Sequence, residues 1–214
     1  MIKIAPSLLS ASLLELEDEI ESLQDCGADF LHYDIMDGIF APNIALGFKL
    51  LEDISSKFKI PLDVHFMIIE PAQYIERAIK CGAARLSFHI EARGGIEANI
   101  KLIKSLGVKA GLAIRPDTKI ETLFPYIKDL DFVIVMGVMP GYSGQKFIPE
   151  TTEKIKKLAG YIKNNNLKTE IEFDGGLTED NAMEIKQAGA EVLVTGNTFF
   201  QSRNRKKVIK ILRG

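Results

Sequence analysis

Short apolar segments alternate with amphipathic segments along the whole chain, and this alternation limits the possible folds more than any other feature. The expected strands are Lys3–Pro6, Phe30–Ile35, Leu62–Met67, Arg85–His89, Lys109–Ile114, Phe132–Met136, Glu170–Asp174 and Val192–Thr195. The expected helices between them include Leu13–Cys26, Pro71–Cys81, Ile96–Leu106, Thr151–Lys163 and Asn181–Ala188. Strands that are separated by helices pair in parallel. Eight such units in 214 residues favour an α/β fold, the closed (β/α)8 TIM barrel, over an open doubly wound sheet. No linker divides the chain, so we expect a single domain over residues 1–214.

Composition excludes several classes of protein. The formal net charge is −2, and no basic stripe is interleaved with aromatic residues, so a nucleic-acid partner is not expected. The longest apolar run, Phe132–Met139, is far too short to cross a bilayer, so no membrane partner is expected either. The two cysteines, Cys26 and Cys81, each precede a glycine at an expected helix end. We interpret both as reduced, packed thiols of a cytoplasmic protein.

Polar residues, including all three histidines, are expected at the C-terminal ends of the strands, where a barrel carries its functional groups. Side chains on a strand alternate between its two faces, so His32 and Asp34 share one face. A buried carboxylate without a partner is costly, so this pair indicates a metal site. With His65 and Asp174 it offers four ligands, His32, Asp34, His65 and Asp174, to one divalent ion. Zn²⁺ suits this set best, and Mn²⁺, Fe²⁺ and Co²⁺ also accept mixed nitrogen and oxygen ligands.

A third histidine, His89, also ends an expected strand, and its role stays open. It either takes part in the site or is a buried ring that Glu91, two residues later, holds in place.

The two aspartates of this set, Asp34 and Asp174, are expected on opposite sides of the barrel mouth. Two such bases can remove a proton from one face of a carbon and return one to the other face, which inverts the centre. The metal ion would stabilise the charge of the enediolate that forms in between. The two carboxyls would titrate as a coupled pair. Three methionines at strand ends are expected to form an apolar collar that excludes water, although Met is more often plain core packing: Met36, Met67 and Met136.

Glycine-rich segments follow three consecutive strands: Pro140–Gln145, Asp174–Gly176 and Thr195–Thr198. Glycines let backbone N–H groups approach a phosphate closely, and barrels often bind phosphate with their last two loops. Tight turns alone would also use glycine. No Walker-type or dinucleotide pattern is present, so a nucleotide is not implied.

Taken together, these motifs resemble the ribulose-phosphate 3-epimerase family over nearly the whole chain. The resemblance rests on Ala5–Ala11, His32–Gly38 with Phe40–Asn43, Asp63–Met67, Phe88–Ala92, Val135–Met136 and Asp174–Gly176. It implies a catalytic barrel, an isomerase that interconverts D-ribulose 5-phosphate and D-xylulose 5-phosphate, and a homo-oligomer. Asp34 and Asp174 would be the acid/base pair within the metal quartet. Substrate would contact Ser7, His65 and the three methionines. Phosphate would contact Gly141, Tyr142, Ser143, Gly144, Gly175, Gly176, Gly196 and Asn197.

Four positions depart from the usual family pattern: Arg115, Met139, Ser143 and Asn197. They leave open a longer ketose phosphate, such as D-allulose 6-phosphate, although the Gly175–Gly176 pair favours the pentulose. A non-catalytic sugar-phosphate binder also remains an alternative. A Schiff-base aldolase is not expected, because none of the eight strand ends carries a lysine.

Overall fold

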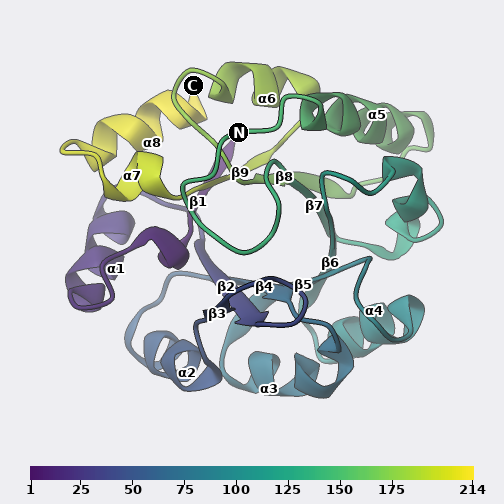
Figure 1. The fold of residues 1–214 in the computed structure, drawn as a ribbon, viewed down its shortest axis with the longest axis horizontal. Coiled ribbons are helices and arrows are strands. Elements are labelled where there is room, and N and C mark those ends of the chain that lie inside the picture. Colours follow the sequence, from purple (N-terminus) through teal and green to yellow (C-terminus); the bar gives the residue numbers. More distant parts are fainter.

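The computed structural model describes residues 1–214 and has eight parallel strands arranged as a barrel (Figure 1). Its strands are β1 (Lys3–Pro6), β2 (Leu31–Asp37), β4 (Leu62–Met67), β5 (Ala83–His89), β6 (Lys109–Ile114), β7 (Phe132–Met136), β8 (Glu170–Asp174) and β9 (Val192–Thr195). They pair in the order β1-β9-β8-β7-β6-β5-β4-β2, and a parallel bridge between Ser7 and His32 joins β1 to β2. The predicted (β/α)8 fold is confirmed. Six of the eight strands have the predicted bounds. The strand β2 is Leu31–Asp37 where Phe30–Ile35 was predicted, and β5 begins at Ala83 where Arg85 was predicted.

Helices surround this ring of strands on the outside (Figure 1). They are α1 (Leu16–Asp25), α2 (Phe48–Lys57), α3 (Ile75–Lys80), α4 (Ile96–Ser105), α5 (Thr151–Asn164), α6 (Ala182–Ala188), α7 (Asn197–Phe200) and α8 (Arg205–Arg213). Two short 3₁₀ turns, η3 (Ile120–Leu123) and η4 (Ile127–Asp129), replace a helix between β6 and β7. A two-residue strand, β3 (Ile44–Ala45), pairs antiparallel with the end of β2 and was not predicted. None of the helices combines the length and the apolar composition that crossing a bilayer requires.

The two faces of the strands have different surroundings. On β2, Leu31, Tyr33 and Ile35 belong to the large apolar core between the strands and the helices. The alternate residues of β2 face the barrel interior instead, as the period of two predicts. One side of that interior is apolar, because Ala113, Phe132, Ile134, Met136 and Val138 form a separate cluster there. The inward residues of the neighbouring strands β2, β4 and β5, and those of β8 across the barrel, are largely polar, and these residues hold the site.

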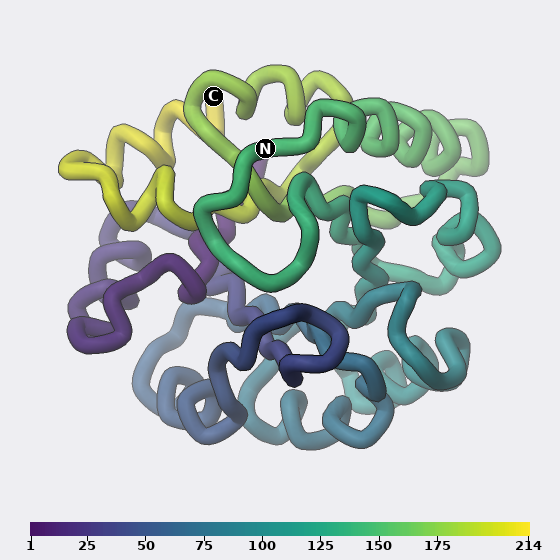
Figure 2. Tube along the Cα trace, viewed as in Figure 1, coloured from purple at the N-terminus to yellow at the C-terminus, as the bar shows by residue number.

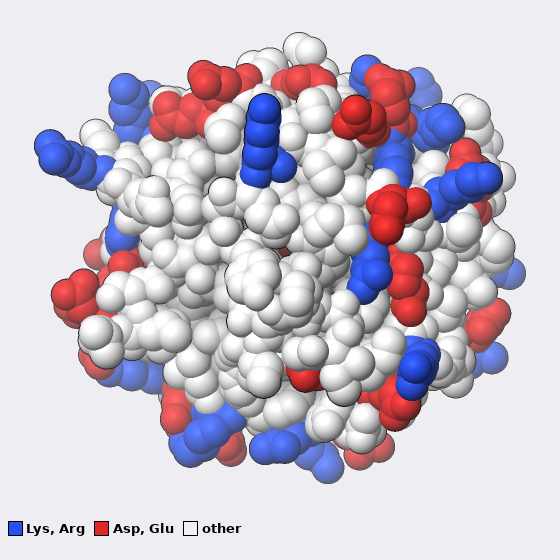
Figure 3. Space-filling model, in the orientation of Figure 1, with Lys and Arg blue, Asp and Glu red and all other residues white.

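A long segment, residues 137–150 between β7 and α5, arches over the barrel mouth (Figure 2). It is tied to the segment that follows β2: Asn43 Nδ2 donates to Gly141 O at 2.8 Å, and the Tyr142 hydroxyl donates to Pro42 O. Charged side chains gather around the periphery of this face, and its centre is largely uncharged (Figure 3). The mouth is therefore partly covered by uncharged groups.

Cys26 and Cys81 are both free thiols, as expected.

Candidate active site

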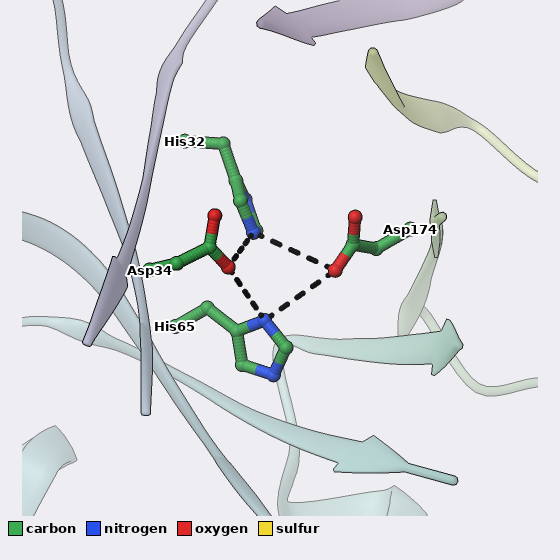
Figure 4. Close-up of side chains that lie close together, drawn as sticks. All are labelled: His32, Asp34, His65 and Asp174. Atoms are coloured by element: carbon green, nitrogen blue, oxygen red, sulfur yellow. Dashed lines mark ion pairs between the residues drawn. The ribbon is translucent and has the colours of Figure 1, made fainter. Parts of the chain in front are cut away.

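Four ligand atoms meet near the carboxyl ends of three strands (Figure 4). His32 and Asp34 come from β2, His65 from the neighbouring β4, and Asp174 from β8 across the barrel. Asp34 Oδ1 lies 3.3 Å from His32 Nε2 and 3.5 Å from His65 Nδ1. Asp174 Oδ2 lies 3.6 Å from His65 Nδ1 and 3.9 Å from His32 Nε2. All four atoms lie within 4.8 Å of one another. The structure thus brings the predicted quartet together.

The quartet fits a divalent cation. His32 Nε2 and His65 Nδ1 are buried and have no hydrogen-bond partner, which is rare for buried polar atoms. Ligand atoms around a tetrahedral ion lie about 3.3 Å apart when the bonds are about 2.0–2.1 Å long, close to the observed separations. Two imidazoles and two carboxylates also form a donor set that Zn²⁺ and its neighbours in the first transition row accept.

Mutual contacts shift the pKa values of Asp34, His32 and His65. Burial alone raises the pKa of Asp34, but the neighbouring His32 and His65 rings bring that pKa below its usual value. Burial alone lowers the pKa of His32 and of His65, but the carboxylates beside them raise both above the ordinary value. Asp34 and the two imidazoles therefore stabilise one another's charged forms in the absence of a cation.

A buried charged network lies beneath His32. Asp63 Oδ2 is 2.7 Å from His32 Nδ1, and Arg85 Nε is 2.9 Å from Asp63 Oδ1. The same guanidinium contacts Glu172 and Glu170. Burial raises the pKa of Asp63, but the charges of Arg85 and His32 and the hydrogen bonds to Asp63 together hold that pKa below the usual range. Burial and the charge of Asp63 raise the pKa of Glu172 to about 7.

Sequence reasoning missed this network, although a signal was present. Asp63 precedes His65 by two residues and Glu172 precedes Asp174 by two, so each pair shares one face of its strand. The expectation that His32 lies at a strand end is wrong, because it is the second residue of β2. His32 consequently lies deeper in the barrel, where Asp63 reaches its Nδ1.

His89 stands behind His65 and not among the ligands. Its Nε2 is 3.0 Å from His65 Nε2, and its Nδ1 is 3.1 Å from Glu91 Oε2. Burial lowers the pKa of His89 to about 4. Burial works against ionisation of Glu91, yet its hydrogen bond with His89 and other contacts lower its pKa to about 2. His89 is therefore a neutral ring that connects Glu91 to His65.

A cavity of about 350 Å³ opens above the quartet. Asp34 and Asp174 line it, together with Met36, Met67 and Met136. Ser7 also lines it, and its hydroxyl donates to Asp34 Oδ2 at 2.6 Å. His65 is fully buried behind the aspartates and does not line the cavity.

The glycine-rich loops form the other wall of the cavity. Every residue that the sequence assigned to phosphate lines it: Gly141, Tyr142, Ser143, Gly144, Gly175, Gly176, Gly196 and Asn197. The sequence reasoning assigned no role to six further polar lining residues, namely Ser10, Gln145, Lys146, Thr178, Asn181 and Thr198. A Cβ on Gly176, whose φ is +70°, would lie 2.7 Å from Phe147 Cα. The loops thus pack backbone against backbone, which leaves main-chain atoms at the cavity surface.

Three of the four departures from the family pattern, Met139, Ser143 and Asn197, line the cavity. Arg115 does not. Its guanidinium donates to Phe40 O at 2.8 Å and lies 4.1 Å from the centre of the Phe40 ring. Its side chain therefore braces the segment after β2 and does not contact the cavity.

Comparison with known proteins gives consistent matches over the chain. A family model described as the ribulose-phosphate 3 epimerase family matches residues 3–200. A ribulose-phosphate 3-epimerase of Bacillus subtilis is 42% identical over 215 residues, covering 100% of this chain and 99% of the relative. One of Aquifex aeolicus is 38% identical and covers 94% of this chain and 90% of the relative. A solved 3-hexulose-6-phosphate synthase shares the fold at a TM-score of 0.69, with 15% identity over 99% of this chain and 98% of that one.

Proposed function

The chain belongs to the ribulose-phosphate 3-epimerase family, and from this premise we propose that it is the isomerase that interconverts D-ribulose 5-phosphate and D-xylulose 5-phosphate. The observation that supports this most is the pair of carboxylates, Asp34 on β2 and Asp174 on β8. They reach one cavity from opposite sides of the barrel, with an oxygen of each inside the same cluster of ligand atoms.

In the proposed mechanism the two aspartates act on C3 of the sugar. One carboxylate removes the C3 proton from its side, and the other carboxyl delivers a proton from the opposite side. Ser7 holds Asp34 in place through its hydroxyl. Met36, Met67 and Met136 keep water away from the reacting carbon. The backbone of the glycine-rich loops binds the phosphate at the other end of the cavity.

We propose that His32, Asp34, His65 and Asp174 hold one divalent ion, Zn²⁺ in the first place, with Mn²⁺, Fe²⁺ or Co²⁺ as substitutes. When bound, this ion supplies positive charge that stabilises negative charge developing next to C3. We also propose a single catalytic domain over residues 1–214, a homo-oligomer, a cytoplasmic location, and no nucleic-acid or membrane partner.

Exchange of the C3 proton with solvent tests this function directly. In D₂O, NMR should show ribulose 5-phosphate converting to xylulose 5-phosphate with deuterium entering C3 of both. Binding of the sugar phosphate without deuterium at C3 would mean a non-catalytic binder. Faster turnover of D-allulose 6-phosphate would shift the assignment to the hexulose phosphate. Met139, Ser143 and Asn197, which line the cavity and depart from the family pattern, would then account for the preference.

Removing the metal ion should abolish turnover. Dialysis against a strong chelator is expected to lower kcat by more than about 100-fold, because a bound ion contributes several kcal/mol of charge stabilisation. Stoichiometric Zn²⁺ or Mn²⁺ should restore it. If protein that elemental analysis shows to be metal-free kept full activity, this result would contradict the cation site.

A further inference from the structure

The two ring nitrogens of His65 have different surroundings. Nδ1 faces the cation quartet and has no hydrogen-bond partner, whereas Nε2 lies 3.0 Å from His89 Nε2. Both rings are fully buried, with their centres 5.0 Å apart and their planes at 25° to each other. Two imidazole nitrogens form a hydrogen bond only when one carries a proton and the other does not. The position of that proton decides whether His65 Nδ1 has a lone pair to offer.

Glu91 sets the direction of this hydrogen bond. Its Oε1 accepts the backbone N–H of Arg115 at 2.9 Å, and its Oε2 is 3.1 Å from His89 Nδ1. A carboxylate can only accept, so the proton of a neutral His89 lies on Nδ1 and its Nε2 is bare. A neutral His65 must then donate from Nε2, and its Nδ1 is left unprotonated toward the other three ligands.

Packing keeps His65, His89 and Glu91 in place. The centre of the Phe40 ring lies 4.7 Å from the centre of the His89 ring. The Arg115 guanidinium lies 4.1 Å from the centre of the same Phe40 ring. His32 has a related arrangement, since its Nδ1 meets Asp63 at 2.7 Å and its Nε2 faces the quartet without a partner. Both histidines of the quartet thus contact a carboxylate, directly or through one ring, on the side away from the cavity.

We propose that His89 and Glu91 are positioning residues, which fix the tautomer of His65 that leaves Nδ1 free to bind the cation. The inference rests on the cation site of the proposed function. Neither residue touches the cavity, and both act through His65. Outer partners of this kind typically change metal affinity by about 10–100-fold when they are lost.

Glu91→Gln tests the direction of the hydrogen bonds that run from His65 through His89 to Glu91, with almost no change in side-chain volume. The backbone N–H of Arg115 needs an acceptor, so it keeps the amide oxygen on its own side and turns the NH₂ group toward His89 Nδ1. His89 must then accept at Nδ1 and carry its proton on Nε2, which leaves His65 protonated at Nδ1. We expect the Kd for Zn²⁺, measured by competition with a chelating dye, to rise about 10–100-fold. The matched control is Glu97→Gln on the exposed face of α4, for which the Kd should not change.

A second measurement reads the tautomer itself. Long-range ¹H–¹⁵N NMR on the metal-free chain, at an alkaline pH where imidazole is neutral, should show His65 protonated at Nε2 in the wild type. In Glu91→Gln the proton should move to Nδ1. His89→Gln, whose amide oxygen can still accept from His65, should bind Zn²⁺ more tightly than His89→Leu, which cannot.

Two results would overturn the inference: a wild-type His65 protonated at Nδ1, or a Glu91→Gln chain that binds Zn²⁺ with the wild-type Kd. The wild-type spectrum needs no variant, so poor folding of Glu91→Gln leaves the test intact. Neither measurement uses turnover. A chain without epimerase activity that still shows the expected tautomer would count against the proposed function and in favour of the inference.

Discussion

Asp174→Asn and Asp34→Asn are each expected to lower epimerase turnover by about 10²–10⁴-fold, the range in which a positioned acid or base accelerates a proton transfer. An amide cannot take up or return the C3 proton, and each replacement also removes one negative charge from the cation quartet. The measurement is kcat on D-ribulose 5-phosphate with the Zn²⁺-loaded proteins. Asp180→Asn, on the exposed side of the segment after β8, changes the same functional group and should leave kcat unchanged.

Isotope exchange separates a two-base mechanism from general damage to the site. Each variant keeps one aspartate, so each should still exchange the C3 proton of the epimer that presents this proton to the remaining base. The two variants should therefore favour opposite epimers, without net conversion. Retention of more than a few per cent of turnover in either variant would contradict the two-base role.

The architecture and the quartet were predictable because both follow from short-range patterns. Alternating strands and helices specify a parallel sheet, and the period of two specifies which residues of β2 face inward. Strand order then places His65 beside Asp34 and puts Asp174 across the barrel. These steps need only the spacing of residues within each strand and the order of the strands.

Partners that depend on register between strands could not be predicted in the same way. His32 lies opposite Asp63 in the pairing of β2 with β4, and Asp63 lies opposite Arg85 only because the register shifts between Leu62 and Asp63. The sequence of a single strand does not predict such a shift in register. The short 3₁₀ turns between β6 and β7 have a local cause, since Pro116 and Pro125 interrupt that segment and proline ends a helix by removing a donor.

Arg85→Met is expected to lower the free energy of unfolding by about 3–5 kcal/mol, the usual cost of breaking a buried ion pair from one side. Arg85 is 2% exposed, and it is the cation shared by Asp63, Glu172 and the partly exposed Glu170. Methionine keeps an apolar stem of similar length but removes the guanidinium from between Asp63 and Glu172, whereas Glu170 keeps its ion pair with Lys3. Urea unfolding at pH 8 tests this, because that pH lies above the raised pKa of Glu172, about 7. Arg203→Met, at an exposed position, should change stability by no more than about 0.5 kcal/mol.

Removing the whole charge cluster should have a different effect from removing the cation alone. Asp63→Leu and Glu172→Met added to Arg85→Met eliminate the buried charges together, and apolar replacements of a complete buried ionic group are often neutral or stabilising. We therefore expect the triple variant to regain most of the lost stability. It should still bind Zn²⁺ more weakly than the wild type, because His32 Nδ1 has lost Asp63. A triple variant as unstable as Arg85→Met would instead mean that stability depends on packing of the guanidinium against Phe132, whose ring centre lies 3.7 Å from Arg85 Cζ.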